Sequence, residues 1–217
     1  MCSFLVTDQI INNLRFVNQF IKQRGPDATN EYHIHHYTFI HNLLSITGEM
    51  RKQPFVSDDQ KIVCIYNGQI YNYRDFGFPH SDGECLIPAY QKYGESFTQQ
   101  LDGEFALVLF DFEKRLLIVS SDTFRTKPLW YSISKKGVGI GSYKSCLDRI
   151  GLSNSVQFPA NTTHIYNLDT LTCFNKFNVV NFDLTQHKTT FQDWRAAFKQ
   201  SIYKRVHGCR EKIFIIS

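Results

Sequence analysis

The stretch EFALVLFDFEKRLLIVSSD, residues 104–122, constrains the fold of this chain more than any other segment. Apolar and aromatic residues fill both halves, and the charged pair Glu113-Lys114 separates them, which is typical of a β-hairpin. PLWYSISKKGVGIGSY, at 128–143, predicts a second hairpin that turns at residues 135–137. Further strands are expected near residues 3–7, 32–48, 61–73, 163–168 and 171–180. Many aromatic strands with few helices predict stacked sheets flanked by helices, an α+β architecture.

Three segments have helical patterns. In DQIINNLRFVNQFIKQRG, at 8–25, apolar residues recur at helical spacing, with Asp8 as the expected N-cap and Gly25 as the stop. A second helix is expected from about 82 to 94 and a third from about 190 to 206. The apolar run EKIFIIS at 211–217 has the pattern of a buried strand. We therefore expect a domain at 2–185 and the beginning of another at 186–217.

Composition narrows the function classes. The net charge is +4, but the 24 Lys and Arg residues are scattered among 20 acids, so no nucleic-acid partner is expected. No apolar stretch approaches the length of a membrane span, and no leader pattern is present at the start. The six cysteines show no CxxC pair, which favours reduced thiols and a cytoplasmic protein.

The HIHH run at 33–36 invites a metal interpretation, but on a strand its histidines point to opposite faces. His33 and His35 face one way and His36 the other, so at most two can converge, and no further ligand stands at metal-binding spacing nearby. We predict no metal site in this chain.

Several short motifs occur in one order along the chain, and together they are far more specific than any one of them. The set resembles the N-terminal glutaminase domain of asparagine synthetase, a class II, N-terminal-nucleophile (Ntn) glutamine amidotransferase. It consists of Cys2, RGPD at 24–27, HNLLSITG at 41–48 with QP at 53–54, NGQIYNY at 67–73, SDGE at 81–84, LDGEFALVLFD at 101–111 and KPLWY at 127–131.

The resemblance implies a four-layer αββα Ntn hydrolase fold with two stacked antiparallel sheets. It implies glutamine as substrate and a synthetase domain or subunit that receives the ammonia, with asparagine biosynthesis as the family default; a homodimer stays open. In the family, the last helix leads into an ATP-pyrophosphatase-like domain. Ser217 would be the first residue of its pyrophosphate loop, so ATP and Mg²⁺ are expected only for that missing domain, and this chain by itself needs no cofactor.

The family mechanism begins at Cys2. Once Met1 is removed, the thiol (usual pKa about 8.5) lies beside its own α-amine (about 7.7 to 8.0), which can accept the thiol proton. The thiolate attacks the glutamine side-chain amide, ammonia leaves, and water hydrolyses the thioester. By resemblance, the side chain of Asn67 and the backbone N–H of Gly68 form the oxyanion hole; by itself, Asn-Gly would be an ordinary hairpin turn.

The resemblance also assigns substrate-binding residues. Asp82 corresponds to the carboxylate that binds the substrate ammonium, although an aspartate there could instead cap the following helix. Because one residue cannot easily do both, Ser81 is the alternative cap. Gln69, Ser45 and Ile46 are the other expected pocket residues.

Three positions depart from the family pattern. Ser3 replaces the usual glycine, and Gln69 replaces a glutamate. Leu43 replaces the arginine that clamps the glutamine carboxylate, and losing such a contact costs about 1.5 to 3 kcal/mol. Either another cation, with Arg51 the nearest candidate, binds that carboxylate, or the pocket accepts a different amide or binds glutamine poorly.

Three functions therefore remain open. The first is a glutaminase that supplies ammonia. The second is a catalytically impaired scaffold, as in β-lactam-synthetase-like enzymes. The third is an amidohydrolase that acts on another amide.

Overall fold

The computed structural model describes residues 2–46, 49–77 and 79–206. Within these ranges the strands form two antiparallel sheets of six strands each. The first sheet has the order β10-β8-β9-β1-β3-β2. Its strands are β1 (Ser3–Thr7), β2 (Ala28–Ile34), β3 (Tyr37–Leu43), β8 (Trp130–Ser134), β9 (Gly137–Gly141) and β10 (Val156–Gln157).

The second sheet has the order β12-β11-β7-β6-β5-β4. Its strands are β4 (Phe55–Val56), β5 (Ile62–Ile70), β6 (Gly103–Asp111), β7 (Leu116–Ser121), β11 (Thr162–Asn167) and β12 (Cys173–Asn178). The two hairpins expected from the sequence are β6–β7 and β8–β9, as predicted. The helices are α1 (Leu14–Asn18), α2 (Leu86–Tyr93), α3 (Lys144–Arg149) and α4 (Phe191–Val206), with 3₁₀ helices η1 (Lys22–Arg24), η2 (Tyr73–Phe76), η3 (Asp82–Cys85) and η4 (Gly94–Gln100).

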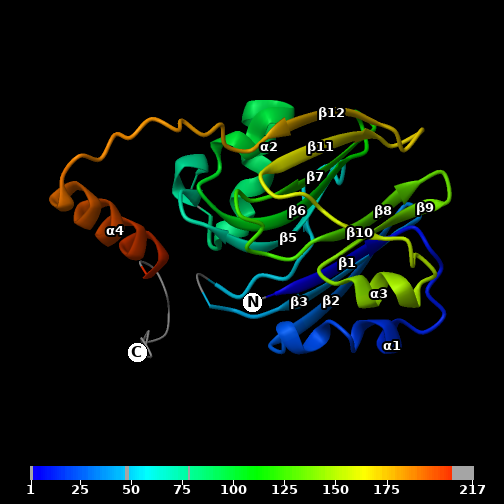
Figure 1. The fold of residues 1–217 in the computed structure, drawn as a ribbon. Helices are drawn as coiled ribbons and strands as arrows, with labels where there is room; N and C mark the ends of the chain where they lie inside the picture. Colours follow the sequence, from blue (N-terminus) through cyan, green and yellow to red (C-terminus); the bar gives the residue numbers. More distant parts are fainter. Residues whose placement is uncertain (1, 47–48, 78, 207–217) are drawn as a thin grey trace.

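The sheets stack face to face, with helices on both outer sides (Figure 1). Because strand side chains alternate, Phe4 and Val6 of β1 enter the core between the sheets, whereas Leu5 packs on the α1 and α3 side. On β5, Val63 and Ile65 enter the same inner core, whereas Cys64 and Tyr66 face α2 and η4. This is the expected four-layer αββα arrangement.

The first predicted helix is wrong in its extent. In place of a helix over 8–25, the chain forms only the short α1 and, after a break, η1. The physical reason is that Asp8 is used elsewhere: its Oδ1 accepts a hydrogen bond from the backbone N–H of Val138 at 2.8 Å. The cap of α1 is instead Asn13, whose side chain accepts from the N–H of Phe16.

The C-terminal helix α4 follows a long extended segment and lies beside the two-sheet body (Figure 1). Along the described chain, none of its residues is buried. The predicted domain boundary near residue 185 stays a prediction, and the apolar run 211–217 with Ser217 lies outside the described residues.

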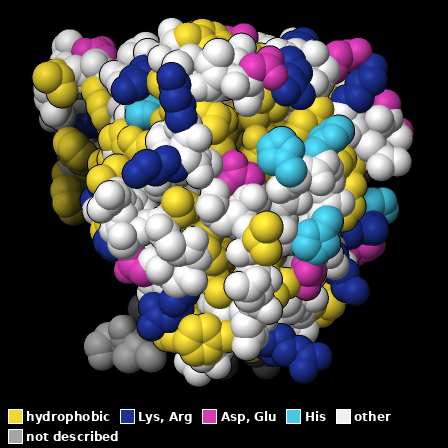
Figure 2. Space-filling view, turned by 90° about the vertical axis from the view of Figure 1, so that its right-hand side faces the viewer, with side chains coloured by type: hydrophobic (Ala, Val, Ile, Leu, Met, Phe, Trp, Pro, Cys, Tyr) yellow, Lys and Arg dark blue, Asp and Glu magenta, His cyan; other side chains and the backbone are white. Residues whose placement is uncertain are grey.

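Figure 2 shows Lys and Arg at separate places among acidic and uncharged residues on one face. Among the helices described here, none is long and apolar enough to cross a membrane. His33, from the HIHH run, contacts Glu31 at 2.6 Å and Thr38 at 3.1 Å. In the part of the chain that the structure describes, no three His, Cys, Asp or Glu side chains are grouped to hold a metal ion.

Candidate active site

Because side chains alternate between the two faces of a strand, the Cys2 thiol and the Asn67 amide lie at the same end of the inner core. Cys2 lies two residues before Phe4, and Asn67 lies two residues after Ile65, on the facing sheet. Both side chains line one cavity of about 90 Å³. All the predicted site residues border this cavity: Cys2, Asn67, Gly68, Asp82, Gln69, Ser45, Ile46 and Arg51.

Cys2 is held at the end of β3 by the backbone of Leu44. The Leu44 N–H donates to the sulfur at 3.4 Å, and the thiol faces the Leu44 carbonyl oxygen at 3.7 Å. Burial raises the pKa of the Cys2 thiol above its usual value. A thiol in this position needs a base close by to become a nucleophile.

Asn67 and Gly68 lie inside β5, so this pair does not form the hairpin turn that an Asn-Gly dipeptide by itself would predict. They pair with Ala106 and Phe105 of β6 in an unbroken nine-residue strand. A Cβ on Gly68 would lie 2.3 Å from the carbonyl oxygen of Glu104 and 2.8 Å from the Cα of Phe105. Only glycine fits here, because the neighbouring backbone occupies the space of a side chain.

The Asn67 side chain is 1% exposed. Among the described residues, no group accepts a hydrogen bond from its buried Nδ2. An amide N–H without a partner in a buried position is costly for the folded state unless a ligand satisfies it. Asn67 therefore offers a neutral donor on the wall of the cavity.

Asp82 is presented by the turn that precedes α2. Ser81 occupies the N-cap position of η3, and Glu84 closes the turn by accepting from the Ser81 N–H at 3.2 Å. This leaves the Asp82 carboxylate to the cavity, where its Oδ2 accepts from the Ile70 N–H at 2.9 Å. Burial raises the pKa of Asp82, whereas hydrogen bonds from Ile70 and the Tyr66 hydroxyl lower it.

The departure at Ser3 is explained by the layer outside the first sheet. Its hydroxyl donates to the Ile21 carbonyl at 2.7 Å and accepts from Asn42 Nδ2 at 3.2 Å. Asn42 in turn exchanges two hydrogen bonds with Asn18. The Ser3 side chain thus points toward α1 and away from the inner core that leads to the cavity.

Leu43, in contrast to Ser3, lines the cavity, and it is 9% exposed. The nearest candidate cation, Arg51, also lines it, but its NH2 lies 2.9 Å from Glu49 and its Nε 3.2 Å from Glu84. The assignment of Arg51 as the carboxylate ligand stays a prediction.

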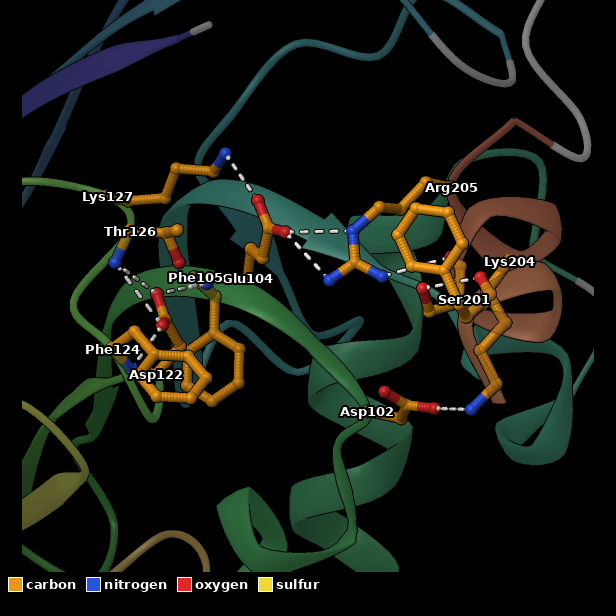
Figure 3. Close-up of polar contacts among 11 residues, drawn as sticks. Asp102, Glu104, Phe105, Asp122, Phe124, Thr126, Lys127, Ser201, Lys204 and Arg205 are labelled. Carbon is orange, nitrogen blue, oxygen red and sulfur yellow. Dashed lines mark hydrogen bonds and ion pairs between the residues drawn. The ribbon is translucent and has the colours of Figure 1, made fainter. Parts of the chain in front are cut away.

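Two further residues line the cavity and have no role predicted from the sequence: Lys127, within the KPLWY motif, and Tyr66, which precedes Asn67 on β5. The Lys127 ammonium lies 3.2 Å from Glu104. Figure 3 shows the Glu104 carboxylate between Lys127 and Arg205 of α4, with Asp102 paired to Lys204 nearby. In the sequence, only the place of Lys127 within the KPLWY motif indicates a role, because its partner Glu104 is far away along the chain.

Comparison with known proteins now bears on this arrangement. Residues 1–180 match the family model described as a glutamine amidotransferase domain. The chain belongs to this family. Two solved structures are similar to this class II glutamine amidotransferase domain in fold. The allosteric regulatory enzyme of purine biosynthesis has a TM-score of 0.57 at 14% identity, covering 83% of this chain and 49% of the other. The glutamine phosphoribosylpyrophosphate amidotransferase of B. subtilis has a TM-score of 0.51 at 16% identity, covering 82% and 43%.

Three curated relatives are each longer than this amidotransferase domain. Amidase chyE of Penicillium rubens is 36% identical over 58% of this chain and 20% of its own length. Asparagine synthetase 1 of Bacillus subtilis is 32% identical over 62% of this chain and 23% of its own. A putative asparagine synthetase of Methanocaldococcus jannaschii is 27% identical over 98% of this chain and 42% of its own. The chain spans about a fifth of the first relatives' length.

Proposed function

We propose that this domain hydrolyses the side-chain amide of a glutamine-type substrate at Cys2 and releases ammonia to a synthetase domain or subunit. The observation that carries the proposal is the shared cavity: the Cys2 thiol and the unpartnered Asn67 amide both line it. The names of the longer relatives, asparagine synthetases and amidases, support the same chemistry.

The first step is activation of the thiol. Removal of Met1 gives Cys2 an α-amine, and the sulfur transfers its proton to this amine. Burial disfavours the free thiolate, so a base on the same residue meets the need of the buried site without a separate histidine. The Leu44 N–H, which donates to the sulfur, stabilises the thiolate.

The sulfur then attacks the amide carbon, and the carbonyl electrons move onto the oxygen. Asn67 Nδ2 and the backbone N–H of Gly68 would bind this oxyanion, a contact that is stronger in the transition state than in the ground state. When the intermediate collapses, the C–N bond breaks, and the α-ammonium returns the proton to the leaving ammonia. Water then attacks the thioester and regenerates the thiol.

Asp82 would hold the substrate ammonium during these steps. Gln69, Ser45 and Ile46 would form the surrounding wall. In this proposal, removal of Asp82 weakens substrate binding and leaves the nucleophile intact.

Intact mass combined with labelling by 6-diazo-5-oxo-norleucine tests the proposal. We expect loss of Met1 and one covalent label on Cys2, with Cys2→Ala as an unlabelled control. The second candidate, a non-catalytic scaffold, is favoured by the apolar Leu43 in the cavity wall. Retained Met1 and an unreactive Cys2 would establish the scaffold instead.

A further inference from the structure

The substrate class of the cavity can be inferred from its charges, and this inference rests on amide hydrolysis at Cys2. The first observation concerns Leu43. Because Ser3 of β1 pairs with Asn42 of β3, Leu43 stands opposite Cys2 at the next position along the two chains. Its side chain gives this part of the wall an apolar surface. A carboxylate brought against it would lose hydration and gain no charged partner.

The second observation concerns the cations of the cavity. Glu49 and Glu84 both bind Arg51, so these three side chains together carry one net negative charge. This cluster repels an incoming substrate carboxylate. To bind Arg51, that carboxylate must compete with Glu49 and Glu84, which already contact it.

Lys127 likewise faces a carboxylate. Its side chain is 10% exposed, and its ammonium lies 3.2 Å from Glu104. Glu104 is fixed near the start of the interior strand β6, opposite Gln69, and Figure 3 shows its ion pair with Lys127. Each cation among the described lining residues thus has an acidic partner from the protein itself.

The third observation is the contrast with Asp82. Its carboxylate receives hydrogen bonds from the Ile70 N–H and the Tyr66 hydroxyl, which are neutral donors. Its negative charge is therefore available to a substrate ammonium. In the described part of the chain, the buried hydroxyl of Ser45 has no hydrogen-bond partner, and this residue lines the cavity. Neutral donors of this kind suit an uncharged carbonyl oxygen.

We infer that the cavity selects glutaminyl amides whose α-ammonium is free and whose carboxyl group is blocked as an uncharged amide or ester, as at the amino end of a peptide. Asp82 binds the ammonium, Ser45 donates to the blocked carbonyl, and Leu43 packs against the blocking group. The reaction at the side-chain amide is unchanged: a C–S bond forms, the C–N bond breaks, and ammonia leaves.

The test compares ammonia release from L-glutamine and from its α-N-methylamide, which has one primary amide. For the natural protein, kcat/KM is expected to be about tenfold to a hundredfold higher for the methylamide, the value of one charge-assisted contact. A preference for free glutamine would overturn the inference and leave hydrolysis at Cys2 intact. If neither compound is hydrolysed and Cys2 is unreactive, the proposed function itself fails.

Substitutions at Leu43, Arg51 and Lys127 test which side chain causes the preference between the two substrates. Leu43→Arg should reverse the preference toward glutamine, whereas Leu43→Met, which keeps the wall apolar, should retain it. Urea unfolding of each variant shows that the fold is retained. Arg51→Ala and Lys127→Met should change KM for both compounds by the same factor. A selective rise in KM for glutamine in either variant would identify that residue as the carboxylate ligand and overturn the inference.

Discussion

The Tyr66 hydroxyl donates a hydrogen bond to the Asp82 carboxylate at the wall of the cavity. Tyr66 comes from β5 and Asp82 from η3, so the contact ties the ammonium-binding group to the strand that carries Asn67. Because a hydrogen bond to the charged form favours that form, Tyr66 holds down the pKa of a carboxyl that burial raises.

Tyr66→Phe should therefore raise the pKa of Asp82. Asp82 would be protonated at a higher pH, and the acid limb of kcat/KM should therefore move to higher pH. A pH profile from 4 to 9 checks this. Tyr93→Phe, on α2 away from the cavity lining, is the control, and an unmoved acid limb in Tyr66→Phe would contradict the role of the contact.

Asn67→Ala should lower kcat by about 10² to 10³ with little change in KM, because its amide is proposed to bind the oxyanion and not the ground-state substrate. Steady-state ammonia release measures both constants. Asn175→Ala, an exposed substitution on β12, should behave as the natural protein. An increase in KM alone would show that Asn67 contributes binding without oxyanion stabilisation.

Gly68→Ala should lower stability by about 1 to 3 kcal/mol, as expected when a side chain is forced into a packed position. The added carbon would lie 2.3 Å from the Glu104 carbonyl oxygen, so β5 and β6 must separate locally. Urea unfolding gives the free energy of unfolding. An unchanged midpoint and slope would show that the two strands adapt without strain.

Ser3→Gly should also be destabilising, by about 1 to 3 kcal/mol, although glycine is the usual family residue. The substitution removes one of the two oxygens to which the buried Asn42 amide donates, and Asn18 Oδ1 is the acceptor that remains. A double-mutant cycle with Asn42→Ala, followed by urea unfolding, should give a coupling energy well above zero. Additive effects would contradict a shared network, and labelling of Cys2 reports separately on the nucleophile.

Glu104→Gln should loosen α4, because Arg205 and Lys204 anchor the C-terminal end of this helix on Glu104 and Asp102. Hydrogen exchange over residues 191–206 should quicken by up to about fivefold, in keeping with about 1 kcal/mol for a partly exposed ion pair. Glu113→Gln, which removes the exposed pair with Lys61, is the matched control. Equal exchange in both variants would show that other contacts hold α4.

The sequence by itself predicted most of the strands, the two hairpins and the proposed site residues. It did not predict β4 or β10, or the turn at residues 35–36 that divides the expected strand region 32–48 between β2 and β3. Alternating side chains fix which residues enter the core, so Phe4 and Ile65 already indicate the direction of Cys2 and Asn67. The ordered motifs then identified the residues that these strands bring together, and all of them border one cavity.

Tertiary structure decided which hydrogen-bond and ion-pair partners the residues have. The local sequence predicts Asp8 as a helix N-cap, but its carboxylate accepts a hydrogen bond from Val138 of β9. The first helix is therefore short. The dipeptide Asn67-Gly68 is typical of a turn, but it pairs with β6 and therefore lies inside a strand. The partners of Arg51, Lys127 and Ser3 likewise come from other elements. Hydrogen bonds and ion pairs act over a few ångströms in space, and separation along the chain does not reveal them.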